Sequence, residues 1–153
     1  MQVRPDDERA LIAALDQARL ALADGDVPIG AVVMAADGSI VSTGRNRREV
    51  DGDPTAHAEI VAIRAAAMSV GEWRLNGMTL AVTLEPCPMC AGAAWLSRVD
   101  RVIFGAWNPE YGAAGSLWDV LRDGRLNHRP EVVGGVREHE CSELLSGFFA
   151  ERR

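Results

Sequence analysis

The chain contains no lysine, and all 16 of its basic residues are arginines. Its 22 acidic residues outnumber them and give a formal net charge of −6. Proteins that bind nucleic acid broadly use many positive side chains to contact phosphate. This charge balance therefore argues against general nucleic-acid binding and leaves room only for a local basic patch.

Long apolar runs are also missing. No stretch approaches the ~20 residues that a helix needs to cross a bilayer, and the first eight residues lack the apolar core of a signal peptide. We therefore expect a cytoplasmic protein with no membrane association. Of the three cysteines, Cys87 and Cys90 are close in sequence and Cys141 is distant. An odd number of cysteines in such a chain does not indicate a disulfide framework.

What is present is typical of one globular domain, which we place at residues 1–153. Hydrophobic residues make up 48% of the chain, enough for a sizeable core, and charged residues make up 25%. Apolar spacing predicts helices at 8–23, 56–68, 87–96 and 138–152. Short β-branched runs predict strands at 29–34, 40–44, 79–83, 101–105 and 132–133.

The order of these elements predicts an α/β fold. The first two strands flank a turn at 36–39 and should form a hairpin. The strands at 79–83 and 101–105 are joined through a helix, which implies a parallel crossover. We expect a mixed sheet with helices on both faces, a loop at 45–54 and a short helix at 116–121.

Two short segments hold the residues from which we predict chemistry. Residues 57–59 read His-Ala-Glu, and residues 86–90 read Pro-Cys-Pro-Met-Cys, each at the expected start of a helix. Cysteines three positions apart there point to one side, and the helix N-terminus favours thiolate, a strong zinc ligand. His57, Cys87 and Cys90 thus supply three ligands for one Zn²⁺. Three protein ligands with an open fourth position describe a catalytic site.

Glu59 follows the histidine by two residues and is expected beside the metal. Zinc lowers the pKa of a bound water toward ~7. A nearby carboxylate can take the proton of that water and later deliver it to a ring nitrogen and a departing amine. These are the parts needed to hydrolyse an aromatic amine, and the order H-x-E…P-C-x-x-C is a signature of zinc-dependent base deaminases.

The same residues allow three other interpretations. A structural zinc knuckle would use the same cysteine pair but needs a fourth ligand, and Cys141, His128 and His139 lie in distant segments. A thioredoxin-like redox pair leaves the histidine and glutamate unexplained. In isolation, Glu59 would be better interpreted as an acid in a first helical turn, but not beside three metal ligands. Cys141 is expected to be buried and His139 exposed, while His128 stays ambiguous.

Nearly the whole chain resembles the bacterial tRNA-specific adenosine deaminases of the cytidine/deoxycytidylate deaminase superfamily, which convert the wobble adenosine of an arginine tRNA anticodon to inosine. The zinc motif is shared by the superfamily, whereas the segments 112–117 (Gly-Ala-Ala-Gly-Ser-Leu) and 127–129 (Asn-His-Arg) are particular to the tRNA enzymes. The other matching segments are 27–32, 46–47, 53–60, 83–87, 89–93, 101–102, 104–106 and 140–141.

The resemblance implies a three-layer α/β/α sandwich around a five-stranded sheet, a homodimer, one Zn²⁺ per subunit, no organic cofactor and a tRNA anticodon stem-loop as partner. The target base is flipped out of the loop into a pocket beside the zinc. The substrate contacts implied by position are Asn46, the backbone of Ala58, Val27, Ile29, Asn108, Phe149 and the terminal arginines Arg152 and Arg153. Without the resemblance, Asn46 reads as an ordinary loop residue, and Val27 and Phe149 read as core.

One loop departs from the family pattern. Family members usually have an aspartate and then a lysine in the loop before Gly112, where this chain has Asn108 and Glu110. Asn108 removes a charge but can still hydrogen-bond, with altered discrimination between ribose and deoxyribose as one consequence. Glu110 would repel a phosphate. Relaxed adenine deamination on single-stranded DNA is therefore one alternative.

Further alternatives remain. The chain is also consistent with a deaminase of a free nucleobase or nucleoside, guanine or cytosine, which needs a pocket closed by its own chain. An RNA enzyme needs an open groove flanked by arginines, for which the candidates are Arg45, Arg47, Arg48, Arg152 and Arg153. A non-catalytic module stabilised by zinc is a third class. The four tryptophans are assigned to core and dimer contacts and not to base stacking, with Trp107 the best exception.

Overall fold

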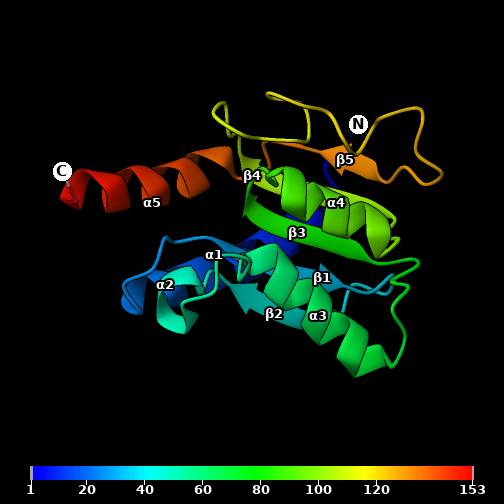
Figure 1. Cartoon of the computed structure of the whole chain (residues 1–153), viewed down its shortest axis with the longest axis horizontal. Helices are drawn as coiled ribbons and strands as arrows, with labels where there is room; N and C mark the ends of the chain where they lie inside the picture. The colour runs from blue at the N-terminus through cyan, green and yellow to red at the C-terminus, as the bar shows by residue number, and fades with distance from the viewer. Residues whose placement is uncertain (1, 153) are drawn as a thin grey trace.

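A computed structural model describes residues 2–152 of the chain. Five strands form one mixed sheet in the order β2-β1-β3-β4-β5 (Figure 1). The strands are β1 (Gly30–Met34), β2 (Ile40–Arg45), β3 (Thr79–Leu84), β4 (Arg101–Ala106) and β5 (Glu131–Val133). β1 pairs with β2 and β3 antiparallel, while β4 runs parallel to both β3 and β5. The hairpin and the parallel crossover predicted from the sequence are confirmed.

Helices cover both faces of this sheet. They are α1 (Pro5–Ala23), α2 (Arg48–Asp51), α3 (Ala58–Val70), α4 (Pro88–Leu96) and α5 (Glu138–Glu151). Helices α3 and α4 lie in front of the sheet in Figure 1, with α1 behind it. The expected three-layer α/β/α sandwich is therefore confirmed. No helix among residues 2–152 is long and apolar enough to span a bilayer.

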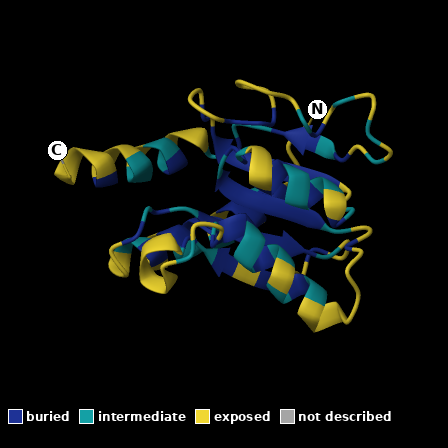
Figure 2. Cartoon of the chain, viewed as in Figure 1, coloured by how far each residue is buried: buried dark blue, intermediate teal, exposed yellow. Residues whose placement is uncertain are grey.

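Strand alternation divides the core between the two faces, because successive side chains of a strand point to opposite sides. Val33, Val82 and Phe104 pack with α3 and α4. Val32, Ala81 and Ile103 pack with α1 and with Cys141 of α5. Figure 2 shows strands β1, β3 and β4 buried, the edge strand β2 partly exposed, and the helices exposed along their outer sides.

Two expectations on the connecting segments are wrong. Residues 45–54 were expected to be a loop but contain the one-turn helix α2, whose end is closed by Gly52 in the left-handed region at φ 60°. Residues 116–121 form no helix; this segment turns back so that Asp119 makes an isolated antiparallel bridge with Ala114. Both segments are held by tertiary contacts, which local apolar spacing does not report.

Candidate active site

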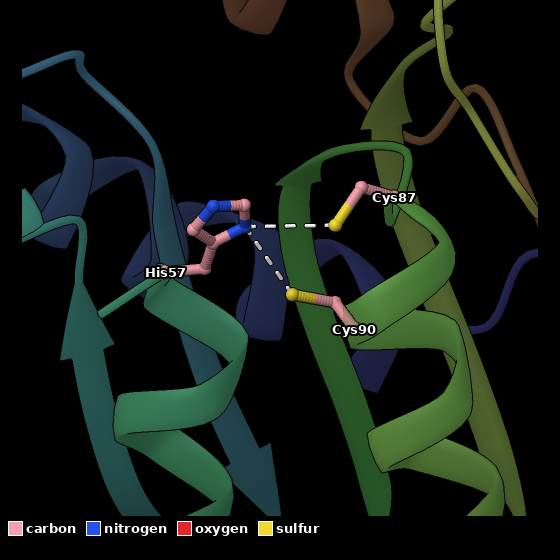
Figure 3. Close-up of side chains that lie close together, drawn as sticks. All are labelled: His57, Cys87 and Cys90. Carbon is pink, nitrogen blue, oxygen red and sulfur yellow. Dashed lines mark hydrogen bonds between the residues drawn. The ribbon is translucent and has the colours of Figure 1, made fainter. Parts of the chain in front are cut away.

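The three predicted zinc ligands lie together at the start of two helices. His57 is the N-cap residue of α3 and Cys87 the N-cap residue of α4, with Cys90 in the first turn of α4. The Nδ1 atom of His57 lies 3.6 Å from Sγ of Cys87 and 3.5 Å from Sγ of Cys90 (Figure 3). All three ligand atoms lie within 4.8 Å of one another. Segments 30 residues apart in sequence therefore converge on one point.

These distances fit a tetrahedral zinc ion. Zinc–sulfur bonds of ~2.3 Å and zinc–nitrogen bonds of ~2.0–2.1 Å at a tetrahedral angle place nitrogen and sulfur ~3.6 Å apart. Both nitrogen–sulfur separations in the structure agree with that value. Among residues 2–152 no fourth histidine, cysteine or acid joins the group. The donor set therefore leaves one coordination position open for a water or a substrate.

The three ligand side chains shift one another's pKa through short contacts. Hydrogen bonding with Cys90 lowers the pKa of Cys87 to about 4, and the same contact together with burial raises the pKa of Cys90. Hydrogen bonding with Cys87 raises the pKa of His57. These directions favour a thiolate at Cys87, the form in which a cysteine binds a metal. A divalent cation would displace the protons that remain on the ligands as it bound.

Glu59 lies in the first turn of α3, two residues after the histidine ligand. Its side chain is 4% exposed and faces the same cavity as His57 and Cys87. Burial raises the pKa of Glu59 to about 7, and the nearby Cys87 sulfur adds to the rise. A carboxyl group with a pKa near neutrality is suited to both accepting and returning a proton.

A cavity of about 290 Å³ adjoins the ligand group. Val27, Ile29 and Phe149 form apolar parts of its lining, as the resemblance implied, together with Asn46, Ala58 and Asn108. The cavity is also lined by Arg48, Leu84, Glu85, Glu110 and Tyr111. Leu84, Glu85 and Tyr111 received no role from the sequence. For Glu85 the available signal was its place immediately before Pro86-Cys87.

The two asparagines of the lining also organise their own loops. Asn46 is 2% exposed, and its Oδ1 accepts a hydrogen bond from the backbone N–H of Arg48 at 3.2 Å. Asn108 is 7% exposed, and its Oδ1 accepts from the N–H groups of Glu110 and Tyr111, both at 3.3 Å. The NH₂ group of each side chain donates no hydrogen bond to another group among residues 2–152. Each asparagine thus keeps a donor for a ligand in the cavity.

Asp26 fixes the wall that contains Asn46 and Arg48. It is fully buried, and its carboxylate accepts hydrogen bonds from the N–H groups of Val27 at 2.9 Å and Glu49 at 3.0 Å, with Val50 at 3.5 Å. These bonds tie α2 to the segment that follows α1. The local sequence does not indicate this task for Asp26, because two of its three partners, Glu49 and Val50, lie more than 20 residues away.

The arginines are divided between ion pairs and the cavity. Arg45 pairs with Asp24, and Arg47 makes two hydrogen bonds to Asp51, so their charges are partly neutralised. Arg48 lines the cavity. Arg152 lines a second hollow, and its guanidinium lies 3.5 Å from the ring centre of Phe148. Arg153 lies outside the described residues.

The remaining candidate residues lie away from the cavity. Cys141 is buried against the other face of the sheet and His139 is exposed, as predicted. His128 lies with its Nε2 2.7 Å from the carbonyl oxygen of Val99. Trp95 is partly buried, whereas Trp73, Trp107 and Trp118 are 53%, 42% and 49% exposed in the single subunit and so lie outside its core; a dimer contact for them stays a prediction.

Comparison with protein families agrees with this site. The model of the cytidine and deoxycytidylate deaminase zinc-binding region matches residues 4–106, a range that includes every zinc ligand and Glu59. The fold and the site therefore define a zinc-dependent deaminase, an enzyme that hydrolyses the carbon–nitrogen bond of a cyclic amidine.

Individual relatives narrow the family. The tRNA-specific adenosine deaminase of Bacillus subtilis (strain 168) is 49% identical over 147 residues, which cover 96% of this chain and 91% of the relative. A solved structure from studies of A-to-I editing by tRNA:A34 deaminases is 41% identical with a TM-score of 0.85, covering 90% of this chain and 99% of the other. The chain belongs to the cytidine and deoxycytidylate deaminase family and, within it, to the group of tRNA-specific adenosine deaminases.

A more distant solved structure has the same fold. It comes from work on a guanine deaminase from Nitrosomonas europaea, with 24% identity and a TM-score of 0.80, and covers 98% of this chain and 87% of the other. At that identity the likeness concerns the fold alone. One architecture therefore serves substrates as different as those two names indicate, and the substrate must be argued from the cavity.

Proposed function

We propose that residues 1–153 form a single domain that deaminates adenosine to inosine at the wobble position of a tRNA anticodon, that of an arginine tRNA. The observation on which this rests is the shape of the site. The cavity of about 290 Å³ beside the zinc ligands shares seven lining residues with a second hollow of about 580 Å³. Its size suits one flipped base, and the hollow gives the rest of an RNA loop a way in.

The continuous hollow favours RNA over a free base. A free-base enzyme needs a pocket that closes around its small substrate, whereas here the space extends past Tyr111 and Phe149 to Arg152. Both aromatic side chains are about half exposed. They offer surfaces on which bases adjacent to the target can stack, and Arg48 and Arg152 offer charges for phosphate. The names of the relatives support the same substrate.

In this proposal each residue near the cavity has a defined task. His57, Cys87 and Cys90 would hold a zinc ion, which would supply Lewis-acid activation of the water nucleophile. Glu59 takes one proton from the attacking water and passes it to the ring nitrogen; it then takes the proton of the newly added hydroxyl and passes it to the amine, so that the carbon–nitrogen bond breaks and ammonia departs. Asn46 and the Ala58 backbone orient the base, and Val27 and Ile29 exclude water from around it.

The loop that departs from the family pattern contributes in a particular way. Asn108 lines the cavity, and its NH₂ group can donate to a ribose or phosphate oxygen. Glu110, exposed at the mouth of the cavity, places a negative charge where RNA would approach. We infer that it weakens phosphate binding there and so increases the dependence on Arg48 and Arg152. The enzyme is proposed to act in the cytoplasm as a homodimer.

The test is a deamination assay with the zinc-loaded protein. An arginine-tRNA anticodon stem-loop with adenosine at the wobble position is incubated beside its deoxyadenosine version and beside free guanine, cytosine and cytidine, and inosine is measured by mass. Inosine in the RNA, absent with Glu59→Gln, is the expected result. Product from the deoxyadenosine loop as well would mean a relaxed gate at Asn108. Ammonia from a free base alone would overturn the tRNA proposal and leave the zinc chemistry intact.

A further inference from the structure

Glu85 is a buried acid next to the site. The proposed reaction requires no proton transfer by this residue. It lies immediately after β3 and is 1% exposed. Both of its carboxylate oxygens are occupied by donors from a single loop. Oε1 accepts from the N–H of Asn108 at 3.0 Å and from the hydroxyl of Ser116, and Oε2 accepts from the N–H groups of Ala114 and Ser116, each at 3.0 Å.

The loop is packed so closely on this carboxylate that one of its residues must be glycine. A Cβ on Gly112 would lie 2.4 Å from Cδ and 2.5 Å from Oε1 of Glu85, too close for any side chain. The backbone adds one further link, since the N–H of Ala113 donates to the carbonyl of Pro86 at 2.8 Å. The segment 108–116 therefore packs around the Glu85 side chain and is held by hydrogen bonds to it.

That segment forms one wall of the cavity. Asn108, Glu110 and Tyr111 line the space in which the base is proposed to bind. Glu85 is also two residues before the zinc ligand Cys87, in the same short connection between β3 and α4. One carboxylate thus connects the segment that holds the metal to the loop that surrounds the substrate. The four donors satisfy the acceptor capacity of a carboxylate. The Glu85 side chain therefore serves to hold the loop in position.

We propose that Glu85 is a positioning residue, which sets the distance between the zinc ligands and the loop of residues 108–116 and thereby the shape of the substrate pocket. This inference rests on the proposed deaminase function. This role differs from general stabilisation of the fold, because loss of Glu85 should change only the cavity wall formed by residues 108–116. Loss of the anchor should weaken substrate binding while leaving the zinc ligands in place.

The first measurement is amide hydrogen exchange on the zinc-loaded protein. Glu85→Gln keeps the size of the side chain but turns an NH₂ group toward two of the four donors, so those donors lose their acceptor. We expect faster exchange either at Asn108 or at Ala114 and Ser116, according to which oxygen the NH₂ group replaces, with a zinc content equal to that of the unaltered chain. Unchanged exchange at these three amides would overturn the proposal without reference to any substrate.

The second measurement uses kinetics on the stem-loop with a matched pair of serine variants. Ser116 does not line the cavity, and its hydroxyl donates to Glu85. Ser42 is buried, and its hydroxyl donates to the carbonyl of Ala62 at 2.7 Å, away from this loop. Ser116→Ala should raise KM about 10-fold, the effect expected for one hydrogen bond to a charged acceptor, and Glu85→Gln by at least that much. Ser42→Ala should lower Tm without changing KM.

The outcomes separate this inference from the proposed function. If Ser116→Ala and Ser42→Ala change KM equally, or if only kcat falls, Glu85 is a stabilising residue and the inference is wrong. Ser116→Ala also keeps the test decisive if Glu85→Gln does not fold. If the unaltered chain is inactive on the stem-loop, the tRNA proposal fails. Glu85→Gln, Ser116→Ala and Ser42→Ala then test Glu85 by amide hydrogen exchange and by KM for the free base that is deaminated.

Discussion

Adding one methyl group at Gly44 should separate the zinc site from overall stability. Gly44 lies in β2 beneath the first turns of α3, the helix whose N-cap residue is His57 and which contains Glu59. A Cβ there would lie 2.4 Å from the carbonyl oxygen of Ala58 and 2.6 Å from the nitrogen of Ala62. Both contacts are with backbone, so no side chain can rotate away. Gly44→Ala must therefore move the start of α3.

The size of that movement follows from the contact distance. Ordinary van der Waals contact begins at 3.4 Å, so the helix start must shift by roughly 1 Å, at a cost of about 1–3 kcal/mol of stability for an overpacked core. Zinc–ligand distances tolerate only about ±0.2 Å. A shift of this size at His57 exceeds that tolerance, and we expect zinc affinity to fall by about 10- to 100-fold, as it does when supporting residues of a metal site are changed.

Gly30 provides the matched control. It lies on the neighbouring strand β1, where a Cβ would lie 2.0 Å from the carbonyl oxygen of Ala14 in α1, on the opposite face of the sheet. Gly30→Ala should lower stability at least as much as Gly44→Ala and leave zinc affinity within about 2-fold of the unaltered chain. Zinc affinity is measured by competition with a chromophoric chelator and stability by urea unfolding of the metal-free protein. Equal zinc affinities for the two variants would refute this reasoning.

Three further predictions concern single acids and one thiol. Glu59→Gln should reduce deamination at least ~10²-fold with zinc content unchanged; full activity would contradict the assigned role. Asp26→Asn turns an NH₂ group toward buried N–H donors and should lower the free energy of unfolding by about 1–3 kcal/mol. It should also raise KM, because Arg48 in the cavity wall would move. Urea unfolding and steady-state kinetics measure the two effects, and an unchanged KM would show that Asp26 does not position the pocket. Burial raises the pKa of Cys141 from 9.0 to about 11, so at pH 8 its thiolate fraction is about 100-fold lower than in the unfolded chain. Mass-resolved alkylation should therefore label Cys141 at least that much more slowly in the folded, zinc-loaded protein, and equal rates with and without urea would rule this out.

The sequence anticipated the main elements because they depend on local patterns. Apolar spacing located α1, α3, α4 and α5, and β-branched runs located all five strands, each within a few residues of its observed bounds. The patterns erred where a segment is shaped by distant partners. Helix α2 forms where the buried carboxylate of Asp26 binds N–H groups of Glu49 and Val50, and residues 116–121 stay non-helical in a loop that folds around Glu85.

The same division holds for the site. Ligand type and spacing were sufficient to predict His57, Cys87 and Cys90. A histidine and a pair of cysteines at two helix starts are typical of a zinc site. The cavity lining beyond the family pattern was not predictable in this way. Leu84 and Tyr111 line the cavity only because the parallel strands β3 and β4 end at the same edge of the sheet, where the loop after β4 begins.

By itself, then, the sequence determined the chemistry: which side chains can hold zinc, which carboxyl group can move protons, and which alternation of strands and helices brings them to one edge. Only the tertiary structure decided the geometry of recognition. It set the 3.5 and 3.6 Å spacing of the ligands, the burial that brings the pKa of Glu59 to about 7, and the hold of Glu85 on the pocket wall. The physical reason is that metal chemistry follows from residue type, whereas distance, burial and hydrogen-bond partners arise only when segments far apart in the chain pack together.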